Sequence, residues 1–146
     1  MQLSNNSQKK IVSYLNRILQ HELAGVIRYT HHSFMVFGFN RIPIVKWLRE
    51  QAQESMLHAQ KAGEMITILG EAPSLSIGKL LSKTTRDLRS ILKDSLAYEQ
   101  EAQQLYEAFL GIVEGQSIML EEYARAMAAE EQMHVGEVMK MLSKPE

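Results

Sequence analysis

A glutamate and a histidine three residues apart, Glu131 and His134, are the part of this sequence best suited to chemistry. The surrounding run has helical spacing and no proline, so both side chains are expected on one face of a helix, one turn apart. A carboxylate and an imidazole placed in this way make a two-point metal site on a rigid support. In an isolated pair of this kind, however, both side chains are usually exposed to solvent and have no shared function.

The hydrophobic pattern around this pair indicates that it faces inward. Apolar residues recur at helical spacing on both sides of the pair, namely Leu120, Ala124, Met127, Val138 and Met141. An unpaired charge within such a stripe is costly, and a bound metal ion removes that cost. The pattern therefore favours a metal site over two solvated side chains.

Three further polar residues interrupt apolar stripes in the same manner. Glu22 and Glu99 stand in the middle of two other predicted helices, and His58 lies on the stripe of a third. Glu22 precedes His58 by 36 residues and Glu99 precedes His134 by 35, so the second half of the chain repeats the glutamate–histidine spacing of the first. Ser55 occupies the position where a glutamate would complete a second glutamate–histidine pair.

The elements that must position these residues are four long helices, predicted over residues 7–37, 43–69, 83–113 and 117–142. Gly38 and Pro43 mark the first turn, with glycine after one helix and proline at the start of the next. The longest connection, residues 70–82, can span the ~40 Å length of a helix, which permits helices two and three to be parallel. We expect an all-α four-helix bundle with one long crossover, in a single domain over residues 1–146.

Composition excludes several classes of protein. The chain has a net charge of −1 and no basic tail, so nucleic acid is not a favoured partner. The absence of cysteine rules out disulfides, thiolate metal sites and cysteine nucleophiles. The polar N-terminus lacks the core of a signal peptide, and no apolar run reaches membrane-spanning length. We expect a cytoplasmic protein without a membrane partner.

Two mid-helix glutamates combined with two glutamate–histidine pairs form the ligand pattern of ferritin-like di-iron bundles. Oxygen and imidazole donors favour iron or manganese, whereas a structural zinc site usually includes sulfur. Because Ser55 carries no charge, Glu22, Glu99 and Glu131 set three negative charges against the four positive charges of two divalent ions. We expect an unequal site with slower oxidation. Glu54, four residues before the second helix's histidine, is a candidate substitute ligand.

The sequence resembles the bacterioferritins over nearly its whole length, to about Leu142. The matching segments are LQHEL (19–23) followed by Tyr29, SMLHA (55–59), LAYE (96–99) and EEQMH (130–134). The resemblance implies a ferritin-like bundle and a ferroxidase centre inside it, where Fe(II) is oxidised by O2 or H2O2 and then stored as mineral in an oligomer. It implies, as ligands of the two irons, Glu22, His58, Glu99, Glu131 and His134.

The same resemblance implies roles for three more residues. Met56 corresponds to the methionine that ligates a haem shared by two subunits at a two-fold axis. Glu50 and Glu54 correspond to positions on the inner wall of the shell, where they are further candidate iron ligands. A helical methionine or a solvated glutamate also fits ordinary packing and needs no such role.

Two departures from the bacterioferritin pattern affect activity and assembly. Ser55 replaces a bridging glutamate, and only twelve residues follow His134, too few for a fifth helix around fourfold channels. A smaller cage, a dimer, and a shell mixed with a related ferritin subunit are therefore all open. Alternative functions are a non-catalytic haem-carrying subunit and another di-iron oxidase or peroxidase on the same bundle. The near-neutral charge gives no support to a DNA-protecting miniferritin.

Overall fold

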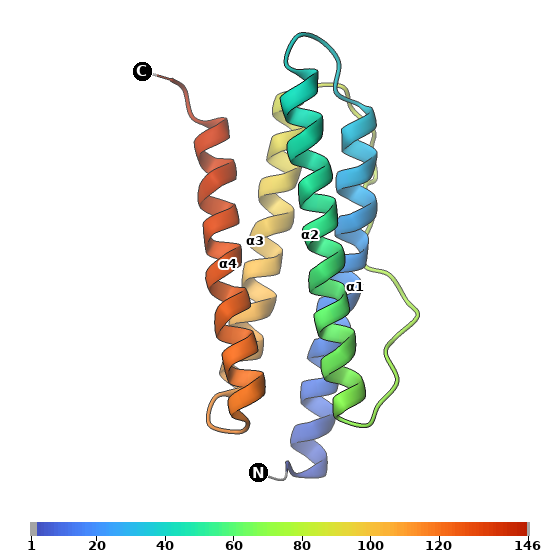
Figure 1. Ribbon diagram of the computed structural model, residues 1–146, viewed down its shortest axis with the longest axis vertical. Helices are drawn as coiled ribbons and strands as arrows, with labels where there is room; N and C mark the ends of the chain where they lie inside the picture. The colour runs from blue at the N-terminus through green and yellow to red at the C-terminus, as the bar shows by residue number, and fades with distance from the viewer. Residues whose placement is uncertain (1–2, 146) are drawn as a thin grey trace.

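The computed structural model describes residues 3–145, and within them the chain forms four helices and no strand. In chain order these helices are α1 (Asn5–Phe34), α2 (Arg41–Ile68), α3 (Leu88–Val113) and α4 (Ile118–Leu142) (Figure 1). The predicted all-α four-helix architecture is confirmed. None of the helices in residues 3–145 is both long enough and apolar enough to cross a membrane.

The helix ends depart from the predicted ones where local capping decides them. α3 begins at Leu88, five residues after the predicted start, because the Asp87 side chain accepts a hydrogen bond from the Ser90 amide at 3.0 Å and caps the helix there. α1 ends at Phe34, three residues before the predicted end. Gly38 then turns the chain with a φ of 99°, a conformation that favours glycine.

The four helices are joined by two tight turns and one long crossover. α1 and α2 form one antiparallel hairpin, and α3 and α4 form another (Figure 1). Residues 69–87 return along α1, so that α2 and α3 run parallel, as predicted. The Gly78 amide donates to the Gln20 carbonyl at 2.9 Å, and the Ser74 amide donates to Asn16 Oδ1 at 2.8 Å. These bonds attach the crossover to α1.

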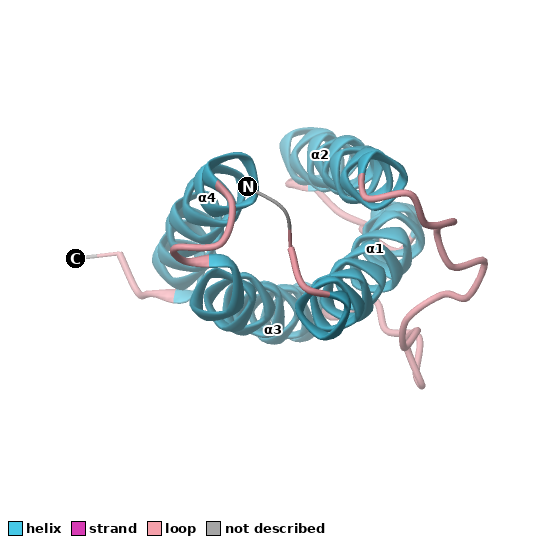
Figure 2. Ribbon diagram, turned by 90° about the horizontal axis from the view of Figure 1, so that it is seen from below, coloured by secondary structure: helices cyan, strands magenta, loops and turns pink. Residues whose placement is uncertain are grey.

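The helices do not pack equally on one another. α1 packs closely on α2, α3 on α4, and α1 on α3, whereas the backbones of α2 and α4 approach each other far less (Figure 2). We call the boundary between these last two helices the α2–α4 seam. It is bridged at mid-height by polar side chains, so this is the side on which the inside of the bundle comes nearest to solvent.

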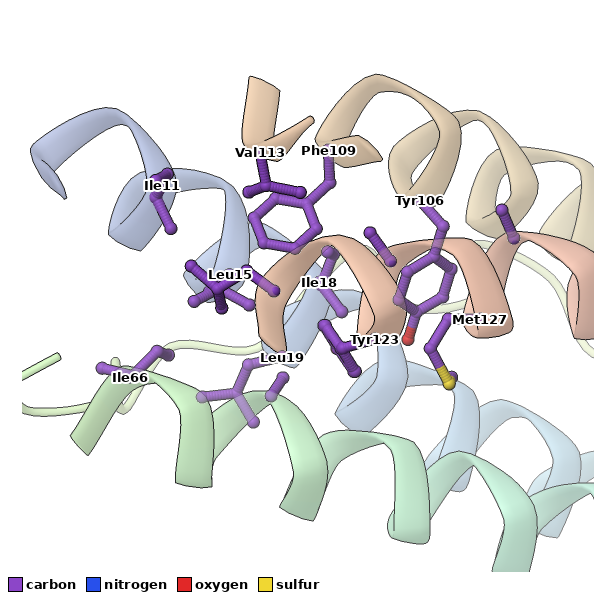
Figure 3. Close-up of a cluster of buried hydrophobic side chains, with 14 of the residues drawn as sticks. Ile11, Leu15, Ile18, Leu19, Ile66, Tyr106, Phe109, Val113, Tyr123 and Met127 are labelled. Atoms are coloured by element: carbon purple, nitrogen blue, oxygen red, sulfur yellow. The ribbon is translucent and has the colours of Figure 1, made fainter. Parts of the chain in front are cut away.

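The apolar core is divided into two parts with a polar layer between them. One cluster lies near the start of α1 and the end of α3, around Ile11, Leu15 and Phe109 (Figure 3). The other surrounds Tyr29 and Leu48. Burial of each large apolar side chain contributes about 1.5–3 kcal/mol, so both ends of the bundle are well stabilised. The layer between them contains buried polar groups, namely Glu22, Ser55, His58, Glu99 and Glu131.

Candidate metal centre

The five predicted ligands lie together at the mid-height of the bundle. α1 contributes Glu22, α2 contributes His58, α3 contributes Glu99, and α4 contributes both Glu131 and His134. The first four of these are at most 3% exposed, and the side chain of His134 is 19% exposed. Helical periodicity accounts for this convergence, because each residue lies on the inward stripe of its own helix.

These five residues form two groups that share one member. In the first group, Nδ1 of His58 lies 3.1 Å from Glu22 Oε2 and 3.6 Å from Glu131 Oε1. In the second, Nδ1 of His134 lies 3.5 Å from Glu99 Oε2 and 3.4 Å from Glu131 Oε2. The two imidazole rings are nearly parallel, and their centroids are 6.4 Å apart. The arrangement offers two adjacent ligand groups.

Glu131 is common to both groups, and each of its two oxygens faces a different histidine. A carboxylate in this position can bridge two metal ions. Glu131 Oε2 and His134 Nδ1 are also buried without a hydrogen-bond partner in residues 3–145. Buried groups left unsatisfied are costly, and a divalent cation would satisfy both atoms. The donor set of three carboxylates and two imidazoles suits iron or manganese.

Tyr29 holds Glu99 in its orientation. The Tyr29 hydroxyl donates a hydrogen bond to Glu99 Oε1, which leaves Oε2 of the same carboxylate facing His134. Burial, reinforced by the charge of Glu99, raises the pKa of Tyr29 well above its usual value. The phenol therefore remains a protonated donor, and one oxygen of Glu99 stays available to a metal ion.

Ser55 is buried, but it brings no carboxylate to the centre. Tyr98 lies beside it, with its ring stacked on His21 at a centroid distance of 4.3 Å and its hydroxyl donating to the His21 carbonyl at 3.1 Å. A Cβ added at Gly25 would overlap Tyr98 Oη and would lie 2.9 Å from Ser55 Oγ. Glycine thus makes room for two neutral hydroxyls, and the charge of a fourth buried glutamate is absent.

Two further carboxylates lie at the rim of the centre, on the α2–α4 seam. Glu54 Oε1 is 3.2 Å from His134 Nε2 and 3.9 Å from His58 Nε2, and Glu130 Oε1 is 3.4 Å from His58 Nε2. Their side chains are 30% and 37% exposed. Glu54 was a predicted candidate, but Glu130 was missed. Each stands four residues before the histidine of its own helix, and this shared spacing could have identified Glu130.

The structure does not bring Glu50 or Met56 to the centre. Glu50 is exposed on α2, pairs with Lys46 at 4.0 Å, and belongs to none of the ligand groups found in residues 3–145. Met56 is 38% exposed on the same helix. Neither residue can act on an ion held between Glu22, Glu99 and Glu131 within one chain.

Burial and mutual repulsion keep protons in the metal-free centre. Burial, and then the charge of Glu99, raises the pKa of Glu22 well above its usual value. Burial and a hydrogen bond with Glu99 raise the pKa of Glu131 to about 10. For His134, burial is outweighed by the surrounding carboxylates of Glu131, Glu54 and Glu99, which raise its pKa. A metal ion that binds here must displace some of these protons.

Comparisons with known proteins agree with this fold. The family model described as a ferritin-like domain matches residues 12–146. Among solved structures, a ferritin-like, diiron-carboxylate protein from Bacillus anthracis str. Ames superposes with a TM-score of 0.87 at 25% identity, covering 97% of this chain and 100% of that one. The resemblance predicted from the sequence is confirmed at the level of the ferritin-like domain.

Two more distant structures share the fold. Rhodobacter capsulatus bacterioferritin, solved with a metal-free dinuclear site and haem iron, has a TM-score of 0.82 at 23% identity, covering 97% of this chain and 86% of that one. A dodecameric thioferritin related to bacterioferritin, from Bacteroides fragilis, has a TM-score of 0.85 at 24% identity, covering 92% and 85%. At these identities the likeness shows the fold alone.

The metal-free protein is expected to lose stability as the pH rises from 7 to 10. The folded state binds more protons than the unfolded state, because the pKa of Glu131 is raised from 4.5 to about 10 and those of Glu22 and His134 are also raised. The stability linked to each raised carboxyl is fully present below the unfolded pKa and is lost as the pH rises through the folded one. The free energy of unfolding, measured with urea in the presence of a chelator, should fall by about 1–3 kcal/mol.

Glu131→Gln is the matched variant for this measurement, because glutamine cannot ionise. Its free energy of unfolding should change less between pH 7 and 10 than that of the unaltered chain. A metal-free protein whose stability stays level or increases over this range would contradict the assignment of protons to the centre.

Proposed function

This chain belongs to the ferritin-like domain family, and on that basis we propose that it binds two iron ions at this centre, oxidises Fe(II) with O2 or H2O2, and stores the product. Glu131 carries the proposal, because its two oxygens face the two histidines of separate ligand groups. The diiron-carboxylate protein of B. anthracis, matched over its whole length, supports iron as the metal. Cytoplasmic iron detoxification is the role that this activity serves.

Each residue of the centre has a separate task in this proposal. Glu22 and His58 would hold one ion, Glu99 and His134 would hold the other, and Glu131, which belongs to both groups, would serve both ions. Two bound Fe(II) ions would supply the two electrons that reduce O2 or peroxide. Fe(II) binding would release the protons held by Glu22 and Glu131, so these two carboxyls become anionic only when cations are present.

The replacement of a bridging glutamate by Ser55 makes the two ions unequal. Glu22, Glu99 and Glu131 provide three buried negative charges against four positive ones, and the hydroxyls of Ser55 and Tyr98 are neutral. One bridge between the ions is missing. One of the two ions is therefore held less tightly than the other, and oxidation is slower than at a centre with four carboxylates.

Storage requires an oligomer, and the surface of the chain supports one. Large apolar side chains are exposed at the turn between α1 and α2 and on the crossover, notably Phe39, Ile42 and Leu75. An oligomer would bury these side chains, as it does where apolar residues gather into an interface. The dodecameric assembly of the B. fragilis thioferritin is a further indication. The partner is another copy of this chain or a related ferritin subunit.

A haem-carrying subunit is the second candidate function, because Met56 is 38% exposed on α2 and R. capsulatus bacterioferritin contains haem iron. Two copies of Met56 from neighbouring subunits would supply the axial ligands. The purified protein should then show a Soret band in its visible spectrum, and that band should be lost in Met56→Leu. A protein without a Soret band after reconstitution with haem would exclude this role.

Aerobic loading with Fe(II) tests the principal proposal. The protein should oxidise Fe(II) faster than buffer does and should retain many more irons per chain than the two that the centre binds. Glu131→Ala should oxidise Fe(II) at least about tenfold more slowly, because it removes the ligand common to both ions, and even supporting residues around metal sites are worth that much. Glu137→Ala, at an exposed position on the same helix, is the matched control.

Two results would count against iron oxidation and storage. If Glu131→Ala oxidised Fe(II) as fast as the Glu137→Ala control while remaining helical by circular dichroism, the centre would not be the site of oxidation. If the unaltered chain retained no more than two irons, it would bind iron without storing it.

A further inference from the structure

We propose that Glu54 and Glu130 act as positioning residues, which hold His134 and His58 through Nε2 across the α2–α4 seam and so turn both Nδ1 atoms toward the metal ions. The inference rests on the proposed function, because it assigns a task to residues around the same centre. It also gives the exposed rim of the centre a role distinct from that of the buried ligands.

The two nitrogens of each imidazole face different surroundings. Nδ1 of His58 and Nδ1 of His134 lie 3.1–3.6 Å from oxygens of the buried carboxylates. The Nε2 atoms point the other way, toward the partly exposed Glu54 and Glu130 at 3.2 and 3.4 Å. The buried carboxylates and the rim carboxylates are therefore separated by the two rings.

The rim contacts cross the seam in both directions. Glu54 belongs to α2 and reaches His134 on α4, while Glu130 belongs to α4 and reaches His58 on α2. Each carboxylate occupies the position four residues before the histidine of its own helix, so the internal repeat of the chain produces a reciprocal pair. The backbones of α2 and α4 approach each other little, and these side chains connect the two helices at mid-height.

The chemistry of imidazole favours metal binding through Nδ1 and hydrogen bonding through Nε2. A neutral histidine has one nitrogen with a free lone pair and one that carries hydrogen, and the partner of the second nitrogen decides which is which. A carboxylate beside Nε2 accepts the hydrogen bond of Nε2–H, which leaves the lone pair on Nδ1 and fixes the plane of the ring. His58 and His134 both have such a carboxylate.

A competing arrangement uses the rim as a metal site of its own. Glu54, His58 and Glu130 also place ligand atoms within 4.8 Å of one another. A neutral His58 has only one lone pair, however, so it cannot bind an ion through Nε2 while Nδ1 binds an ion beside Glu22 and Glu131. Occupation of the buried centre therefore favours the positioning role for the rim.

The rim carboxylates also affect the charge balance of the centre, in which Ser55 stands where a glutamate would carry a negative charge. The three buried glutamates leave one of four positive charges unmatched, and Glu54 and Glu130 lie within hydrogen-bonding range of the two imidazoles. The rim would thus add negative charge near the two ions without adding a ligand, although outside the buried layer. Loss of either rim carboxylate should therefore weaken metal binding without changing the number of ions.

Anaerobic titration of the full chain with Co(II), followed by its visible d–d spectrum, tests this inference. The unaltered protein should bind two Co(II) per chain. Glu54→Ala and Glu130→Ala should still bind two, with affinity lowered about 10–100-fold, as for other residues that orient metal-binding histidines. Glu54→Gln and Glu130→Gln should bind more tightly than the alanine variants, because the amide oxygen still accepts from Nε2–H. Exposed Glu64→Ala on α2 and Glu137→Ala on α4 are the controls.

Three results would overturn the inference. Alanine variants that match the controls would show that the rim carboxylates do not act on the histidines. Glutamine variants no better than alanine, together with the loss of one Co(II) per chain, would make the rim residue a metal ligand. If the unaltered chain bound no Co(II), the proposed function itself would fail, which separates that outcome from the first two.

Discussion

Three buried glutamates without a lysine or arginine partner are the constraint on which the rest of this structure depends. Glu22, Glu99 and Glu131 are 1–3% exposed, and across residues 3–145 the charged groups paired with them are histidines, with no lysine or arginine. Carboxylates in an apolar interior are costly unless they are protonated or neutralised by a cation. In the metal-free protein the raised pKa values of Glu22 and Glu131 keep these two carboxyls protonated, whereas for Glu99 burial is outweighed by its neighbours, which lower its pKa, and a pair of divalent ions would neutralise all three.

The rest of the molecule is stable in spite of the free-energy cost of these buried carboxylates. Apolar clusters above and below the polar layer hold the four helices together, so the centre need not contribute to stability in order to exist. The first helical hairpin brings one glutamate and one histidine, and the second brings two glutamates and one histidine. The crossover sets α2 parallel to α3, so that these side chains lie at the same height in the bundle. At the α2–α4 seam the two backbones approach each other little, and there the rim carboxylates meet the outer nitrogens of the histidines.

Much of this structure could be predicted from the sequence, because the hydrophobic periodicity of a long amphipathic helix shows which residues face inward. The four helices, the crossover and the convergence of Glu22, His58, Glu99, Glu131 and His134 follow from polar residues that interrupt apolar stripes. The start of α3 did not follow, since a side-chain cap at Asp87 decides it.

The rim of the centre was harder to predict than its interior. Glu130 stands next to Glu131 and resembles a solvated residue, and its contact with His58 depends on how far apart α2 and α4 lie. The placement of the Tyr98 hydroxyl beside Ser55 was equally hard to predict, because it depends on the absence of a side chain at Gly25. Sequence periodicity identifies which residues face inward, but contacts between helices that are distant in the chain require the packed structure.

Anomalous diffraction from crystals soaked in Mn(II) tests the central claim most directly. Two peaks should appear roughly 3.5–4 Å apart, one among Glu22, His58 and Glu131 and the other among Glu99, Glu131 and His134. The account would be contradicted if this layer held no ion while Mn(II) bound elsewhere on the same chain, or if Glu131 touched neither ion.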